Sequence, residues 1–162
     1  MARDGKTSRP GSTVAVEEGA PLFCPSAQPG MRDPVVIGVV EQDGAQDRRI
    51  AYLEQAIPYD EKVAALSGAV DPGKVMRIAA RCEETRCAHF DGSRCSLVSR
   101  IRDLLPEAAV KAPPCAIRSA CRWFAEQGAA ACLRCERITT SVGPEQVRAD
   151  SRIRQAATPP PL

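Results

Sequence analysis

The most regular apolar run in the chain lies in its first third. Residues 35–40 read V-V-I-G-V-V, and a β-branched run of this kind is typical of a strand. Asp43 and Gly44 then form a turn signal, and residues 48–53, R-R-I-A-Y-L, read as a return strand. The pattern predicts a β-hairpin with a longer loop. Because two strands alone are only marginally stable, the hairpin must pack on another part of the chain.

Helix signals follow the hairpin. Asp60 can cap a short helix that ends near Gly68. Asp71 and Pro72 are the residue types that begin a helix, at the cap and at the first helical position. We expect this second helix to continue to Cys82 and to present one apolar face. That face would comprise Val75, Ile78, Ala79 and Cys82.

Two longer apolar patterns occupy the C-terminal half. Within residues 96–105 the apolar positions recur at helical spacing, and Pro106 ends the pattern. Residues 116–127 show the same spacing and end before Gly128. The apolar positions of the first pattern are Leu97, Val98, Ile101, Leu104 and Leu105, and those of the second are Ile117, Ala120, Cys121 and Phe124. The sequence therefore predicts two amphipathic helices here.

The predicted elements fit a single α+β domain over residues 21–141. A small β-hairpin and a short helix fill residues 21–75, and a helical, cysteine-rich part that binds a metal or cluster fills residues 76–141. The hairpin would pack on this helical part. Residues 1–20 and 142–162 are polar and lack sustained periodicity, so we expect a disordered arm and a disordered tail.

Composition limits the core that this domain can build. Aromatic residues make up 4% of the chain, and aromatic side chains carry much of the area that cores bury. A thin core of small aliphatic residues commonly needs a metal or a cross-link as reinforcement. The eight cysteines fit that need.

Charge is distributed unevenly along the chain. Residues 31–75 carry five basic and eight acidic groups, whereas residues 76–140 carry eleven and seven. The second half is mildly basic but lacks the dense basic stripe of a strong nucleic-acid binder. No apolar run reaches the roughly 18–20 residues that span a bilayer, and residues 1–16 lack the apolar segment of a signal peptide. We expect a cytoplasmic location, where thiols stay reduced and can bind metal, and no membrane partner.

Four cysteines within a short stretch form the strongest chemical signal. They make up the C-terminal set, which is spaced C-x5-C-x10-C-x2-C and comprises Cys115, Cys121, Cys132 and Cys135. Four thiolates suit tetrahedral zinc or an iron–sulfur cluster. Cys115 and Cys121 would lie about 240° apart around an unbroken helix, so they could not both face one ion from it. We expect Cys115 to precede the helix and Cys121 to lie on its inner face.

A second group of candidate ligands, the central set, comprises Cys82, Cys87, His89 and Cys95. Three thiolates and an imidazole also suit a metal ion. Two alternatives stay open: two separate sites, or one site with the remaining cysteines as buried thiols. Cys24, between Phe23 and Pro25, reads as a lone thiol or as an exchangeable ligand on a loop.

The surroundings of the C-terminal set favour an iron–sulfur cluster over a zinc ribbon. Zinc ribbons usually carry paired C-x2-C units with a glycine close behind, whereas only one such unit, Cys132 to Cys135, occurs here and no glycine follows it. Trp123 and Phe124 can shield a cluster from water. Three arginines can offset the charge of a cluster or donate hydrogen bonds to its sulfurs: Arg118, Arg122 and Arg134.

We therefore expect an iron–sulfur protein that acts in electron transfer or in redox or iron sensing, with a redox or regulatory protein as its partner. The alternatives are a structural zinc-binding module for protein or nucleic-acid interaction, and a metal-free thiol redox protein. The chain has no Gly-rich phosphate loop, no G-x-S-x-G and no H-E-x-x-H, so we expect no catalytic activity of its own.

Overall fold

Four antiparallel strands form the central sheet of the computed structural model, which describes residues 20–43 and 47–138. In spatial order the strands are β1 (Phe23–Cys24), β4 (Met76–Arg81), β2 (Val35–Asp43) and β3 (Asp47–Pro58). The predicted hairpin is confirmed as the β2–β3 pair, although Gly44 of its turn lies outside the described residues. The arm predicted before residue 20 and the predicted tail also lie outside them.

The central strand β4 corrects the expectation from the sequence. The helix predicted to continue to Cys82 is wrong, because helix α2 is a single turn, Pro72–Val75, capped by the Asp71 side chain. From Met76 the chain is extended and pairs with β2 on one edge and with β1 on the other. Five consecutive residues of β4 are buried. A run buried on both faces shows no alternation, so periodicity cannot distinguish it from a buried helix.

Short helices make up most of the remaining structure. The predicted helix at Asp60 is confirmed as α1 (Glu61–Ala65), and the one over residues 96–105 as α3 (Ser96–Leu104). The continuous helix predicted over residues 116–127 is wrong, because Cys121 separates a 3-10 turn, η2 (Arg118–Ala120), from α4 (Arg122–Gln127). The other elements are η1 (Glu84–Arg86), α5 (Ala129–Cys132) and η3 (Cys135–Arg137). Within the described ranges, no helix is long and apolar enough to cross a membrane.

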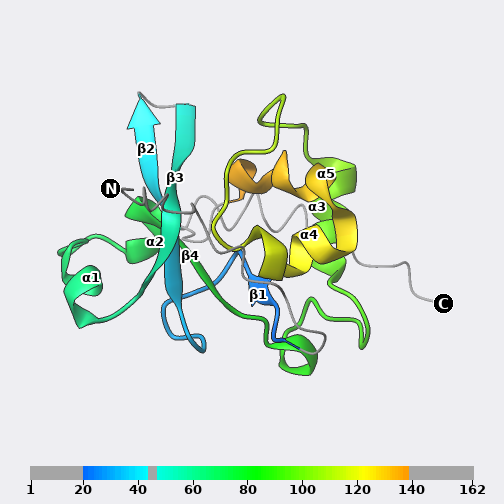
Figure 1. Cartoon of the computed structure of the whole chain (residues 1–162), viewed down its shortest axis with the longest axis horizontal. Helices are drawn as coiled ribbons and strands as arrows, with labels where there is room; N and C mark the ends of the chain where they lie inside the picture. The colour runs from blue at the N-terminus through cyan, green and yellow to red at the C-terminus, as the bar shows by residue number, and fades with distance from the viewer. Residues whose placement is uncertain (1–19, 44–46, 139–162) are drawn as a thin grey trace, which may run out of the picture.

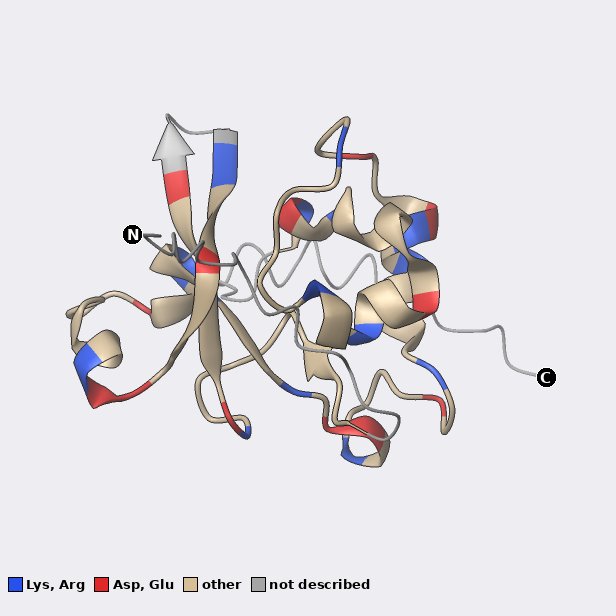
Figure 2. Cartoon of the chain, viewed as in Figure 1, with Lys and Arg blue, Asp and Glu red and all other residues tan. Residues whose placement is uncertain are grey.

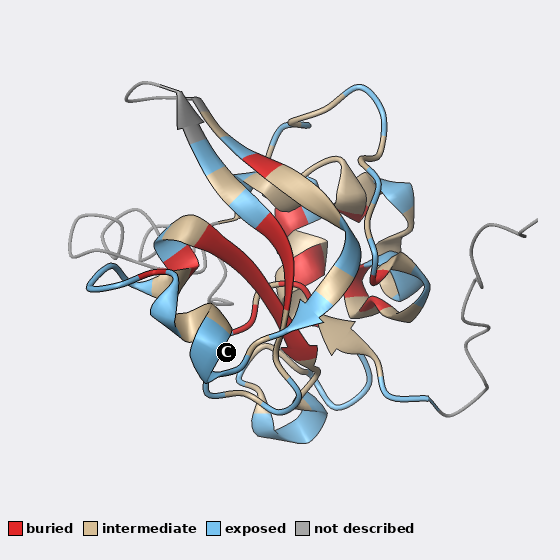
Figure 3. Ribbon diagram, turned by 60° about the vertical axis from the view of Figure 1, so that its left-hand side comes forward, coloured by how far each residue is buried: buried red, intermediate tan, exposed pale blue. Residues whose placement is uncertain are grey.

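The sheet separates two hydrophobic cores, and the fold is α+β. Val36 and Ile37 of β2 belong to opposite cores, and so do Ile78 and Ala79 of β4, as the alternation of side chains along a strand requires. Ile37 and Ala79 pack with α3, α4 and α5, whereas α1 and the connector before β2 cover the other face (Figure 1). Buried residues are concentrated in β2 and β4 (Figure 3).

Gly38 lets strands β2 and β3 approach each other closely. It lies opposite Tyr52 of β3 and Arg77 of β4, beside an irregularity in the register of β2. A Cβ atom at this position would lie 2.5 Å from Ile50 Cγ2 and 3.1 Å from the Ala51 carbonyl oxygen. Only a residue without a side chain fits this space.

We expect Gly38→Ala to destabilise the protein by about 1–3 kcal/mol, because the added methyl group overlaps a packed side chain. Gly30→Ala is the matched control, since nothing lies within 4 Å of a Cβ atom at Gly30. Its free energy of unfolding should stay within about 0.5 kcal/mol of wild type. Urea denaturation measures both variants, and equal stability of the two would contradict the close approach.

Candidate metal centre

The four cysteines of the C-terminal set line one pocket, which we call the cysteine pocket. Its cavity volume is about 20 Å³, and it opens to solvent. Its mainly apolar walls also include Pro25, Tyr52, Arg118, Trp123 and Phe124. Residues from the segment between β1 and β2, from strand β3 and from the helical half therefore meet at this pocket.

Each cysteine of the C-terminal set lies at the end of a short helical segment. Cys115 precedes η2, and Cys121 lies between η2 and α4. Cys132 is the last residue of α5, and Cys135 is the first residue of η3. Cys115 precedes the helix as predicted, and Cys121 lies at the N-terminus of α4, buried in the core between the sheet and the helices. Because the helix is broken at Cys121, the two thiols are not held at the angular offset of a straight helix.

Burial makes two of these thiols, Cys115 and Cys121, weak acids. It raises the pKa of Cys121 to about 12, and the backbone N–H groups of Phe124 and Trp123, which bond to the sulfur, act against this rise. Burial also raises the pKa of Cys115, and charge on the neighbouring Cys135 contributes in the same direction. Without metal these thiols are protonated at neutral pH, and metal binding must release the protons.

A buried arginine lies beside the cysteine pocket. Arg77 of β4 is 1% exposed, and its Nη2 donates to the Cys135 sulfur at 3.3 Å. Its Nε and Nη1 donate to the carbonyl oxygens of Pro25 at 2.6 Å and Ile138 at 2.7 Å. No carboxylate of the described residues forms an ion pair with Arg77. A buried cation needs a counter-charge, and a metal-bound Cys135 sulfur would supply it.

Three residues that line the cysteine pocket carry a buried polar atom without a hydrogen-bond partner in the part of the chain that the structure describes: Arg118 Nε, the Tyr52 hydroxyl and Trp123 Nε1. Arg118 is held in place by the Pro113 carbonyl oxygen, which accepts from its Nη2. Buried donors are normally paired, so Arg118 Nε indicates an acceptor that the polypeptide itself does not supply. The Tyr52 hydroxyl lies near Cys135, since burial and then the charge of Cys135 raise the pKa of Tyr52.

The other arginines predicted to offset the charge of a cluster lie elsewhere. Arg118 lines the cysteine pocket, but Arg122 forms an ion pair with Glu84 at 2.8 Å. Arg134 donates to the Leu105 carbonyl oxygen at 2.8 Å.

The central set lies around the loop between β4 and α3. Cys82 directly follows β4, Cys87 follows η1, and Cys95 is the N-terminal cap residue of α3. His89 lies in the loop between them, and its backbone N–H donates to the Cys87 sulfur at 3.4 Å.

All eight cysteines lie in the described part of the chain and form no disulfide there. Over the same residues, no three His, Cys, Asp or Glu side chains are arranged as a ready site for one metal ion. The C-terminal set borders the open space of the cysteine pocket instead.

We expect Arg77→Met to lower the free energy of unfolding by about 3 kcal/mol or more, because hydrogen bonds to a charged group contribute about 1.5–3 kcal/mol each. Arg81→Met, on the same strand, is the matched control. Arg81 pairs with Asp33 at 3.5 Å, and the two side chains are 35% and 68% exposed. Exposed pairs of this kind contribute about 1 kcal/mol or less. Urea denaturation under anaerobic conditions measures both variants. Equal decreases in the free energy of unfolding would show that the hydrogen bonds of Arg77 do not stabilise the contact between the sheet and the pocket.

Comparison with known proteins adds no family to this description. No protein-family model, curated protein or solved structure matches the chain. The function is therefore argued from the chemistry of the site.

Proposed function

We propose that the protein binds an iron–sulfur cluster through the C-terminal set and acts in electron transfer or in redox or iron sensing. The observation that carries this proposal is the cysteine pocket, which is lined by Cys115, Cys121, Cys132 and Cys135. Cysteine thiolates are the usual ligands of such clusters. A redox or regulatory protein is the partner that this function implies.

The arrangement of the C-terminal set favours a cluster over a single ion. Around one zinc ion, four sulfurs lie about 2.3 Å from the metal and close to one another. No three His, Cys, Asp or Glu side chains of the described residues are arranged in that way. In a cluster the thiolates bind separate iron atoms and lie further apart, around the edge of the bound group.

The charges around the pocket favour an anionic group. A cluster with four thiolate ligands carries net negative charge, and its sulfurs accept hydrogen bonds. Arg77 already donates to the Cys135 sulfur, and Arg118 has a buried Nε without a partner in the described residues. Both arginines would supply counter-charge and donors to such a cluster. Donors and positive charge next to a cluster raise its reduction potential.

The edge of the pocket suits contact with a protein partner. Trp123 in the pocket wall is 1% exposed, whereas Phe124 beside it is 36% exposed. Lys and Arg are interspersed with Asp and Glu over both the sheet and the helical half (Figure 2). An exposed aromatic side chain with mixed charge around it favours a protein partner over nucleic acid.

Anaerobic purification tests the proposal. The wild-type protein should be coloured and should contain iron and acid-labile sulfide in similar amounts. The double variant Cys132→Ser/Cys135→Ser removes two of the four proposed ligands, so the part of the iron and sulfide bound at this site should be lost. Ser119→Ala is the control, because Ser119 lies exposed on η2 and is not a proposed ligand.

The alternatives predict different results in the same experiment. A colourless wild-type protein with stoichiometric zinc, which unfolds when a chelator removes the metal, would contradict the cluster and support a structural zinc module. A wild-type protein without metal whose thiols oxidise reversibly would support a thiol redox protein.

We expect Arg118→Gln to lower the midpoint reduction potential of the cluster by on the order of 50 mV, because a positive charge beside it is lost; in a one-electron couple about 59 mV is a tenfold change in the equilibrium constant. Arg118→Lys keeps the charge and should shift the potential less. Arg102→Gln is the distant control, since Arg102 is exposed on α3 and pairs with Asp103. Anaerobic redox titration measures the potentials, and an unchanged value in Arg118→Gln would show that this side chain does not act on the bound group.

A further inference from the structure

We propose that four cysteines from three parts of the chain form a second, all-thiolate metal centre, in which Cys24 is the fourth ligand and His89 is not a ligand. We call these residues the Cys24 group: Cys24, Cys82, Cys87 and Cys95. Four thiolates select a thiophilic metal, which is either iron with sulfide or zinc. The Cys24 group shares no ligand with the C-terminal set, so this inference does not rest on the function proposed for the cysteine pocket.

Strand pairing brings Cys24 and Cys82 together. In the antiparallel ladder between β1 and β4, Cys24 lies opposite Ala80. Two residues further along the ladder, the backbone N–H of Cys82 donates to the Leu22 carbonyl oxygen at 2.8 Å. Because side chains alternate between the two faces of a sheet, Cys24 and Cys82 point to the same face as diagonal neighbours. The pairing therefore joins a cysteine of the N-terminal connector to the first cysteine of the central set.

A closed loop positions Cys87 and Cys95. Phe90 and Cys95 form an antiparallel bridge, and the backbone N–H of Ser96 donates to the His89 carbonyl oxygen at 2.7 Å. The backbone N–H of His89 donates in turn to the Cys87 sulfur at 3.4 Å. Backbone N–H groups directed at a cysteine sulfur stabilise the thiolate that a metal requires.

Helix α4 supports the Cys24 group from the helical half. Both carboxylate oxygens of Glu126 accept from the backbone N–H of Cys95 at 3.0 Å. The Arg122 guanidinium donates to Glu84 at 2.8 Å and lies 5.4 Å from the centroid of the Phe90 ring, so it is held against the loop that carries Cys82, Cys87 and Cys95. The Cys24 group therefore has its own cation, as the cysteine pocket has another.

The four sulfurs of the Cys24 group are electrostatic neighbours. Burial raises the pKa of Cys24 to about 12, and the charges of Cys82, Cys95 and Cys87 make smaller contributions in the same direction. Cys24 therefore lies within electrostatic range of the other three sulfurs.

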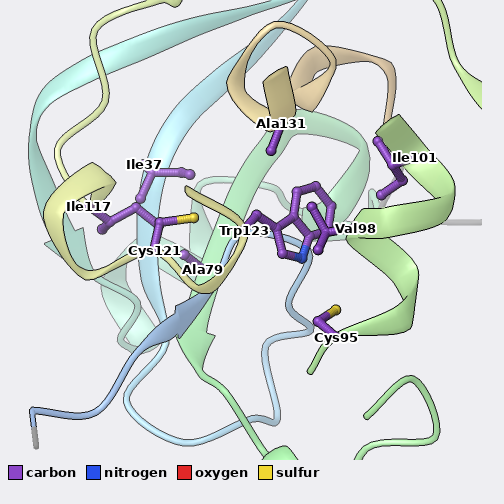
Figure 4. Close-up of a cluster of buried hydrophobic side chains, with 9 residues drawn as sticks. All are labelled: Ile37, Ala79, Cys95, Val98, Ile101, Ile117, Cys121, Trp123 and Ala131. Carbon is purple, nitrogen blue, oxygen red and sulfur yellow. The ribbon is translucent and has the colours of Figure 1, made fainter. Parts of the chain in front are cut away.

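Trp123 offers this centre a buried donor. Its indole is 1% exposed, and Nε1 has no hydrogen-bond partner among the described residues. The indole nitrogen lies on the edge of the ring that faces Cys95 (Figure 4). A neutral thiol is a weak acceptor, whereas a metal-bound thiolate is a good one. Metal binding at Cys95 would therefore satisfy a donor that the polypeptide leaves without a partner.

The test uses the full chain with the C-terminal set disabled by Cys132→Ser/Cys135→Ser. Purified anaerobically, this protein should still carry stoichiometric metal. Adding Cys24→Ser should lower the bound metal at least tenfold after dialysis against a chelator, whereas adding His89→Gln should leave it unchanged. Iron with acid-labile sulfide identifies a cluster at the Cys24 group, and zinc without sulfide identifies a mononuclear site.

Cobalt(II) titration of the metal-free proteins provides a second measurement that does not depend on the native metal. The thiolate-to-cobalt absorbance per bound ion should fall by about one quarter with Cys24→Ser, since one of four thiolates is lost, and should stay the same with His89→Gln. The fluorescence of Trp123, the single tryptophan, checks that each variant is folded.

Two results would overturn the proposal. Retention of the metal in Cys24→Ser together with its loss in His89→Gln would show that His89 is the fourth ligand. Metal in wild type but none in the Cys132→Ser/Cys135→Ser variant would show that there is no second centre. A wild type without iron whose zinc persists in that double variant would support the Cys24 group while contradicting the cluster in the cysteine pocket.

Discussion

The buried guanidinium of Arg77 is the constraint on which the arrangement around the cysteine pocket depends. From the central strand it donates to the carbonyl oxygens of Pro25 and Ile138 and to the Cys135 sulfur. It therefore joins the sheet both to the connector before β2 and to the last described residues of the chain. Burying a charge is costly unless the charge is paired as well as hydrogen-bonded. The two carbonyl groups satisfy the hydrogen bonds of Arg77 but not its charge. A cluster-bound Cys135 sulfur, as we propose, would satisfy both.

The helices around the cysteine pocket are too short to be stable on their own. Helix α4 has six residues and α5 has four, whereas isolated helices below about 12–15 residues are marginal in water. Their stability must come from packing on the sheet, with Trp123 of α4 and Ala131 of α5 in the shared core, and from whatever holds their ends together. The cysteines of the C-terminal set lie at those ends, so a bound group would fix several short segments at once. Metal binding would then contribute directly to the free energy of folding. Such binding would reinforce a chain with 4% aromatic residues that builds a domain with two small cores.

Local patterns could be predicted from the sequence, and long-range pairing could not. The β2–β3 hairpin and α3 follow from alternation and from a helical stripe, which neighbouring residues determine. Strand β4 could not be predicted, because Asp71 and Pro72 do begin a helix and only pairing with β2 and β1 makes the next residues extended. The burial of Arg77 and the neighbours of Cys24 could not be predicted for the same reason. A helix predicted over the residues of β4 gives no reason to expect a buried arginine there. The neighbours of Cys24 are set by the pairing of β1 with β4. The C-terminal set could be recognised as one group because its four cysteines lie in one stretch of chain, and all four line the same pocket.

The two candidate centres lie next to each other in the fold. Phe23, adjacent to Cys24, forms a parallel bridge with Cys121 of the cysteine pocket. Trp123 lines that pocket while its indole nitrogen faces Cys95. With iron–sulfur clusters at both sites, the negative charges would repel through a poorly screened interior, so reduction of one cluster would make reduction of the other harder. The chain would then carry electrons one at a time over two separated potentials. With zinc at the Cys24 group, that site would hold a fixed charge, and its influence on a cluster in the pocket would be structural and electrostatic but not redox-active.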